Sequence, residues 1–194
     1  MLRLFFAEVF DLGLVQTDPN FGNYLINDDG SELTLLDFGS VFELDPTVRR
    51  ALCNAILAGL INDEARLETA LVALGCLKSD AGEVAKATFK AFISNLLEPL
   101  RPPEALQPEH VNAEGLYSWG RSELINRTSQ QVARSLTNKE FAIPSGDFAM
   151  VARKLTGVFT FIAVLNAEFN GYDIVKPYLD QITASGGDRQ MSSN

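Results

Sequence analysis

Two stretches of this chain, residues 16–23 with the sequence QTDPNFGN and residues 37–39 with the sequence DFG, decide its fold. Two short β-forming runs, 23–26 and 33–36, lie between them. The Asp29-Gly30 pair between these runs predicts a tight hairpin turn. The sequence therefore presents an Asp, an Asn five positions later, a hairpin and a second Asp, in that order.

This order is typical of the catalytic and metal-binding loops of protein-kinase-like phosphotransferases. Asp18 is then the candidate catalytic residue, which orients or deprotonates the acceptor hydroxyl. Asn23 and Asp37 supply hard oxygen ligands for Mg²⁺, and Gly39 gives the backbone the freedom to leave the metal site. Each motif alone would more often start a turn or end a strand, so the prediction rests on their combination.

The rest of the chain is predicted to be helical, which gives a mainly α fold with a small β-hairpin. Residues 2–12 form a first helix that Gly13 ends, and Asp45 with Pro46 begins a second that runs to about residue 62. The stretch 98–109 holds four of the eight prolines and is predicted to be a loop. Further helices are expected at about 63–77, 80–98, 114–137, 146–169 and 172–183.

Composition and charge narrow the classes of function. The chain has 194 residues with 25 acidic and 16 basic side chains, a net charge of −9, which argues against nucleic acid as a partner. Two cysteines and one histidine signal neither a disulfide framework nor a zinc site, so Cys53 and Cys76 are interpreted as buried thiols. The apolar stretch 155–167 is too short to span a bilayer, and no export signal is visible.

The pattern QTDPNFGNYLI…LTLLDFG resembles the UbiB/ADCK (AarF-type) family of atypical protein-kinase-like proteins. Gln16-Thr17 precedes the Asp-Pro of this pattern where ordinary protein kinases carry His-Arg, and the form is closest to the coenzyme Q biosynthesis branch. The closing helices, with Ile143-Pro144 and the sequence VARKLTG at 151–157, look like those of the family. Only residues 14–42 carry the specific part of the resemblance.

The resemblance implies an ATP-binding, Mg²⁺-dependent fold that supports ubiquinone biosynthesis, with ATP as ligand and isoprenoid lipids or coenzyme Q biosynthesis proteins as partners. By position, Asp18 would be the catalytic Asp, and Asn23 and Asp37 the metal ligands. Only 17 residues precede Asp18, so no nucleotide-clamping N-lobe is expected, and the family's Lys-x-Gly-Gln signature is absent. We therefore expect a kinase-like C-lobe at 1–184, divided into 1–44 and 45–184, and a flexible tail at 185–194.

Two alternatives remain open. The chain could be a truncated or pseudokinase module that performs no chemistry and binds a protein or an isoprenoid lipid. It could also be a small-molecule phosphotransferase of the aminoglycoside or choline kinase type, although those carry His where this chain has Gln16. The expected location is the cytoplasm, with peripheral membrane association, or the mitochondrial matrix in a eukaryote.

Several charged side chains outside the motif have plain interpretations. His110 is expected to face solvent, because no second imidazole accompanies it. The pairs Arg49-Arg50 and Arg153-Lys154 are expected to be solvated.

The apolar stripes at 89–97 and 159–165 are predicted to face the core.

Overall fold

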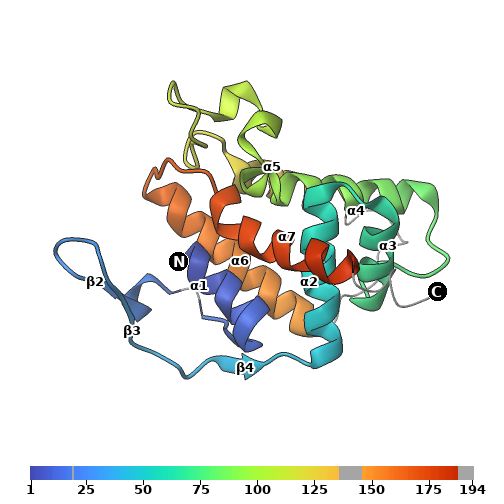
Figure 1. Ribbon diagram of the computed structural model, residues 1–194, viewed down its shortest axis with the longest axis horizontal. Coiled ribbons are helices and arrows are strands. Elements are labelled where there is room, and N and C mark those ends of the chain that lie inside the picture. The colour runs from blue at the N-terminus through green and yellow to red at the C-terminus, as the bar shows by residue number, and fades with distance from the viewer. Residues whose placement is uncertain (19, 136–145, 188–194) are drawn as a thin grey trace.

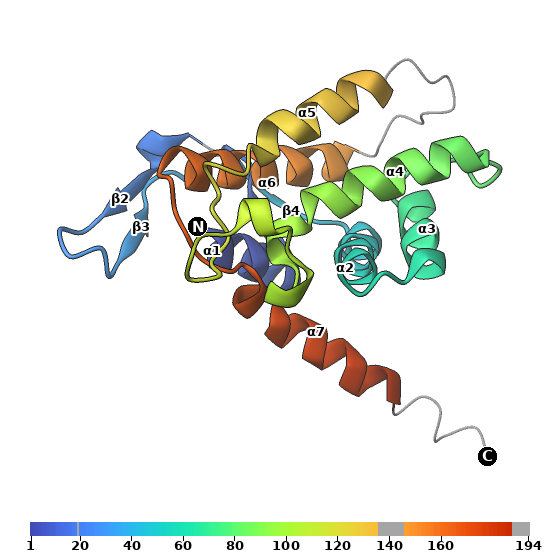
Figure 2. The same cartoon turned by 90° about the horizontal axis from the view of Figure 1, so that it is seen from above.

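The computed structural model of the protein describes residues 1–18, 20–135 and 146–187. A helical body makes up most of it, and a β-hairpin projects from this body in both ribbon views (Figures 1 and 2). The prediction of a mainly helical chain with a small hairpin is thereby confirmed. Ile143, Pro144 and residues 188–194 of the predicted tail lie outside the described residues. The helices are α1 (Leu2–Phe6), α2 (Pro46–Ile61), α3 (Glu64–Ala73), α4 (Glu83–Leu96), α5 (Leu124–Ser135), α6 (Gly146–Val164) and α7 (Tyr172–Gly187).

The first helix of the chain lies between α6 and α7 (Figure 2). It continues without a break as the π-helical segment η1 (Ala7–Leu12), so the predicted helix at 2–12 is confirmed. Gly13 ends it with a φ of 68°, a left-handed conformation that glycine adopts without steric strain. Phe6 is completely buried and stacks on Tyr178 of α7 at 5.8 Å between ring centroids.

Helix α2 begins where the sequence predicts it. The Asp45 carboxylate accepts a hydrogen bond from the backbone N–H of Thr47 at 2.8 Å. Arg49 then reaches back to η1, where its guanidinium donates to the carbonyls of Val9 and Phe10. Arg49 is therefore half-buried and not solvated as expected, because the orphan carbonyls at the end of η1 need donors.

In the part of the chain that the structure describes, four three-residue strands form two separate antiparallel pairs. In the projecting hairpin, β2 (Tyr24–Ile26) pairs with β3 (Leu33–Leu35). The hairpin turn contains Gly30 with a φ of 72°, as the Asp-Gly pair predicts. The other pair, β1 (Leu14–Gln16) with β4 (Val41–Glu43), was not predicted from the sequence. It closes the segment that carries both motifs into a loop whose two ends are hydrogen-bonded.

The largest error in the predicted helices is at 114–137, since α5 begins only at Leu124. Backbone donors just before it bond to a distant segment: the N–H of Tyr117 donates to the Asn170 side chain and that of Trp119 to the carbonyl of Ala167. Trp119 also donates its indole N–H to the carbonyl of Phe169 at 3.1 Å. These long-range bonds use the backbone donors of Tyr117 and Trp119 that a helix starting near residue 114 would need, so tertiary structure overrides the helical pattern there.

The connector 98–110 forms three short 3₁₀ turns, η3 (Glu98–Leu100), η4 (Pro103–Ala105) and η5 (Pro108–His110). The predicted loop is thus confirmed, but it is anchored by a buried carboxylate. Glu98 accepts two hydrogen bonds from Arg127 of α5, at 2.9 and 3.0 Å, and one from the Tyr117 hydroxyl at 3.0 Å. His110 Nδ1 lies 2.6 Å from the same carboxylate, so the expectation that it faces solvent is wrong.

The core holds most of the apolar stripes that the sequence assigns to it. Phe89, Ile93 and Phe159 are buried, whereas Val164 and Leu165 are exposed and that part of the prediction is wrong. Trp119 is also buried, and its ring stacks on Phe169. Among the described residues, no helix is both long and apolar enough to cross a membrane.

Candidate functional site

The β1–β4 pair brings the two motifs to the same end of the molecule. Directly after β1, Thr17 donates to the carbonyl of Ser40 twice, from its backbone N–H and from its hydroxyl, each at 3.0 Å. Asp18 follows Thr17, and Gly39 precedes Ser40. Asp18 and Gly39, which belong to different motifs, are therefore held close together by the hydrogen bonds between Thr17 and Ser40.

A short turn then returns the chain toward Asp18. Asn20 caps the 3₁₀ turn η2 (Phe21–Asn23), because its side-chain oxygen accepts from the N–H of Gly22 at 2.9 Å. The turn points the Asn23 amide at the first motif residue, and Nδ2 of Asn23 donates to Oδ2 of Asp18 at 2.9 Å. Asn23 is buried and Asp18 is half-buried. The structure thus brings two of the predicted site residues into direct contact.

The hairpin places the third residue beside them. Its ladder continues past β2 and β3, because the N–H of Leu36 donates to the carbonyl of Asn23 at 2.8 Å. Asp37 is the next residue along the chain and is exposed. Its Oδ1 accepts a hydrogen bond from the N–H of Gly39 at 2.7 Å. A Cβ at Gly39 would lie 3.1 Å from that same oxygen, so a side chain there would crowd the carboxylate.

Asn23 and Asp37 carry oxygen atoms of the kind that Mg²⁺ prefers as ligands in proteins. Since Nδ2 of Asn23 is engaged with Asp18, the amide oxygen is the atom left to meet a cation. Oδ2 of Asp37 is likewise the carboxylate oxygen that the Gly39 contact leaves available. Within the described residues, no three His, Cys, Asp or Glu side chains group together as a metal site. One carboxylate and one amide suit Mg²⁺, which keeps water and phosphate as its other ligands.

Lys154 of α6 is buried next to the loop that contains Asp18 and Asn23. The sequence did not predict this lysine as part of the site. Lys154 is 1% exposed, and its Nζ lies 3.3 Å from Oε1 of Gln16 and 3.2 Å from the hydroxyl of Tyr24. It also lies 3.4 Å from the carboxylate of Glu8. The expectation that Lys154 is solvated is therefore wrong. Helical spacing could have found it, because Lys154 falls on the same face as the buried Val151 and Val158.

The Glu8 carboxylate is buried opposite this ammonium. Burial raises the pKa of Glu8 above its ordinary value of 4.5, and the charge and hydrogen bond of Lys154 act in the opposite direction. The two groups come from η1 and α6. This buried ion pair contacts the candidate catalytic loop through the bonds of Lys154 to Gln16 and Tyr24.

Comparison with known proteins agrees with the kinase-like motif that the sequence predicts. Residues 1–71 match the ABC1 atypical kinase-like domain, so the predicted resemblance is confirmed in this region. The match includes α1, both strand pairs and the whole of α2.

Full-length comparison finds similar proteins of the same kind. One is the atypical kinase COQ8, mitochondrial, of Schizosaccharomyces pombe, which is 26% identical over 83% of this chain and 25% of its own length. Another is the atypical kinase COQ8B, mitochondrial, of Rattus norvegicus, which is 26% identical over 95% of this chain and 33% of its own length. A probable serine/threonine-protein kinase, abkA of Dictyostelium discoideum, is 24% identical over 88% of this chain and 29% of its own. The chain thus spans about a quarter to a third of the length of these relatives.

Proposed function

We propose that this chain is the C-lobe of an atypical kinase or ATPase that uses Mg²⁺ and ATP and supports ubiquinone biosynthesis. The observation that carries the proposal is the contact between Asp18 and Asn23, with Asp37 one residue beyond the backbone bond that joins Leu36 to Asn23. These three positions come from separate parts of the sequence motif and gather at one end of the β1–β4 pair. Mg²⁺, when bound, would supply positive charge to offset that of the transferred phosphate.

In this proposal each side chain has a separate task. Asp18 accepts or orients the hydroxyl proton of the acceptor, since its second oxygen is free of the Asn23 bond. Asn23 and Asp37 hold the metal through oxygen atoms, and Gly39 fixes the Asp37 carboxylate through its N–H. The Asp18–Asn23 bond keeps the proton acceptor and the metal ligand at a constant separation.

Exposed apolar side chains around the site support the role of a lobe that is completed by another segment. They lie on the hairpin, on η2 and beside Asp37, where a solvated surface would carry polar residues. Phe38, for example, is 65% exposed. A phosphate-covering lobe in contact with this face would bury them. The exposed set is Phe21, Leu25, Ile26, Leu36, Phe38 and Val41.

Calorimetric titration of the 194-residue chain with ATP, with and without Mg²⁺, tests the metal site. We expect Mg²⁺-dependent binding that Asp37→Asn abolishes. Asp29→Asn is the matched control, because it removes the same charge from an exposed position in the turn of the same hairpin. Asp18→Ala should keep Mg²⁺-dependent binding and lose any ATP hydrolysis. Binding that is unchanged in Asp37→Asn would refute the assigned role.

The proposed role in ubiquinone biosynthesis needs a cellular measurement. In an organism that carries this chain, deletion of its gene should lower the ubiquinone content of extracted lipids. Restoring the wild-type gene should return it, and restoring the Asp37→Asn gene should not. Equal rescue by the wild-type and Asp37→Asn genes would show that the role in ubiquinone biosynthesis does not depend on the proposed metal site.

An apolar cavity favours a second candidate function, that of a module that binds an isoprenoid lipid without chemistry. The cavity has a volume of about 320 Å³ and lies between α2, α4, α5 and α6. Its described lining includes Phe5, Phe92 and Phe148, with hydroxyls from Thr128 and Thr156 and no charged group. ATP hydrolysis by the chain that depends on Asp18 would exclude this candidate as the sole function. Binding of a short polyprenyl alcohol without Mg²⁺-dependent ATP binding would favour it.

A further inference from the structure

A single buried cation joins three segments around the candidate catalytic loop. The Lys154 ammonium has three N–H donors, and its acceptors are the carboxylate of Glu8 in η1, the amide oxygen of Gln16 in β1 and the hydroxyl of Tyr24 in β2. Each acceptor therefore comes from a different element, and all four side chains are buried. A buried charge with this set of partners ties those elements together, because losing any one of them leaves the ammonium without its full set of bonds.

Two of the three acceptors bracket the predicted site. Gln16 lies two residues before Asp18, and Tyr24 lies directly after Asn23. The contacts of Lys154 therefore fall on both sides of the segment that contains the Asp18–Asn23 hydrogen bond. Fixing these two flanks from one atom limits how far Asp18 and Asn23 can separate.

The same face of α6 supports the loop at a second point. Phe161 lies seven residues after Lys154, which is two helical turns along the same side. Its ring stacks on Phe21 at 3.9 Å between centroids and meets the edge of Tyr24 at 6.1 Å. Helix α6 thus contacts the loop through a cation at one flank and an aromatic ring in its middle.

From this arrangement we propose that Lys154 is a positioning residue that holds the 16–24 segment in the geometry that brings Asp18 and Asn23 together. The proposal deepens the proposed function and rests on it for the link to metal and nucleotide binding. Lys154 touches none of the atoms assigned to chemistry. It acts through Gln16 and Tyr24.

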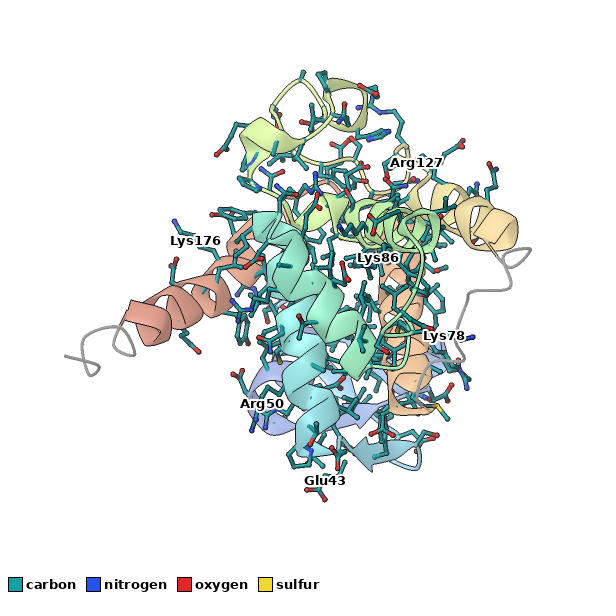
Figure 3. All side chains as sticks on the ribbon, turned by 90° about the vertical axis from the view of Figure 1, so that its right-hand side faces the viewer. Glu43, Arg50, Lys78, Lys86, Arg127 and Lys176 are labelled. Carbon is teal, nitrogen blue, oxygen red and sulfur yellow. The ribbon has the colours of Figure 1, made fainter. Side chains whose placement is uncertain are left out.

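The variants must separate positioning from simple destabilisation. Lys154→Met alone leaves the Glu8 carboxylate buried without its counter-charge, so it is expected to destabilise the whole protein. The pair Lys154→Met with Glu8→Gln removes both charges and nearly keeps the volume. Tyr24→Phe is a milder change that deletes one contact and leaves the ring. Lys176→Met, on the exposed part of α7 labelled in Figure 3, is the matched control for loss of a lysine charge.

Hydrogen–deuterium exchange of the full chain tests the positioning directly. In the Lys154→Met/Glu8→Gln pair we expect amide exchange in residues 20–26 to rise at least about tenfold, while exchange in α2 stays within about twofold of wild type. Tyr24→Phe should give a smaller rise in the same residues, and Lys176→Met no change. A uniform rise across the loop and α2 would show a merely structural charge pair, and no rise in the loop would refute the proposal.

The second measurement is Mg²⁺-dependent ATP binding by the same variants, determined by calorimetric titration. We expect the affinity of the Lys154→Met/Glu8→Gln pair to fall about tenfold, and that of Lys176→Met to equal wild type. If wild type itself shows no Mg²⁺-dependent binding, the proposed function fails while the exchange measurement still decides the positioning role. Loosened exchange with unchanged affinity would overturn the link between Lys154 and the site.

Discussion

Asn23, the last residue of the η2 turn, donates its side-chain amide to the carboxylate of Asp18 at 2.9 Å. Because the contact uses Nδ2 of Asn23, the side-chain oxygen of Asn23 is the amide atom that can meet a cation. The contact also binds together two residues that the sequence motif separates by four positions. Its strength can be measured without any assumption about ligands.

A double-mutant cycle on unfolding tests this contact. The variants are Asp18→Ala, Asn23→Ala and the pair, each followed by urea denaturation. Because the acceptor is a half-buried charged group, we expect a coupling free energy of about 1 to 2 kcal/mol. A parallel cycle of Asp18→Ala with Asp29→Ala should be additive. Additivity between Asp18 and Asn23 would mean that the hydrogen bond is absent in solution.

The Glu98 cluster predicts a specific dependence of stability on pH. Burial by itself would raise the pKa of Glu98, but the hydrogen bonds and charge of Arg127, aided by His110 and Tyr117, hold it below its ordinary value of 4.5. A lowered folded-state pKa adds stability above the unfolded-state pKa, and this is lost as the pH falls through the folded-state value. The free energy of unfolding should therefore fall on acidification below about pH 4.5.

The variant Glu98→Gln isolates this group. We expect it to lower the free energy of unfolding by about 1 to 3 kcal/mol at pH 7 and to weaken the loss on acidification. The exposed Glu104, in the same connector, provides the control as Glu104→Gln. Denaturation curves at pH 7, 5, 4 and 3 would check both effects, and equal acid sensitivity of wild type and Glu98→Gln would contradict the assignment.

Gly171 is packed so closely that a side chain does not fit. A Cβ there would lie 2.6 Å from the carbonyl oxygen of Pro99, which is backbone and cannot swing away. We expect Gly171→Ala to lower the free energy of unfolding by about 1 to 3 kcal/mol. Gly146→Ala is the control, since none of the described residues places an atom within 4 Å of a Cβ at that position beyond its chain neighbours and its own helix backbone. Equal stability of the two variants by thermal denaturation would show that the contact is looser than described.

Both thiols are expected to be unreactive in the folded protein. Burial raises the pKa of Cys53 to about 11 and that of Cys76 to about 12, so almost none of either is present as thiolate at pH 8. A disulfide reagent that reports released thiol should label neither within minutes under native conditions. Both should react at once in concentrated guanidinium chloride. Rapid labelling of one thiol in the native protein would show that its surroundings open to solvent.

The sequence predicted well what depends on neighbouring residues. The Asp45 cap, the Gly13 helix end and the Asp-Gly hairpin each follow from the conformational preferences of a few adjacent residues, and the structure has all three. The order of Asp18, Asn23 and Asp37 was also visible, because motif spacing is a property of the chain itself. The β1–β4 pair that brings the two motifs to one end of the molecule was not predicted, since it joins residues far apart in the sequence.

The failures at Arg49, His110 and residues 114–123 share one cause, which is a partner on another element of the fold. His110 and Arg49 were expected to be solvated, and both are held by groups on other elements. The helix expected from residue 114 gives way because Tyr117 and Trp119 bond to the segment near residue 168. No local pattern contains these partners.

The sequence by itself determined the kinase-like motif, the hairpin within it and the helical character of the rest, because turn chemistry and helical periodicity act over a few residues. Only the tertiary structure decided that Lys154 lies beneath the candidate catalytic loop. Its acceptors on Glu8, Gln16 and Tyr24 are 146, 138 and 130 positions away along the chain. A charged lysine can be buried only if its N–H donors find acceptors, and here the acceptors come from segments that only the folded chain brings together.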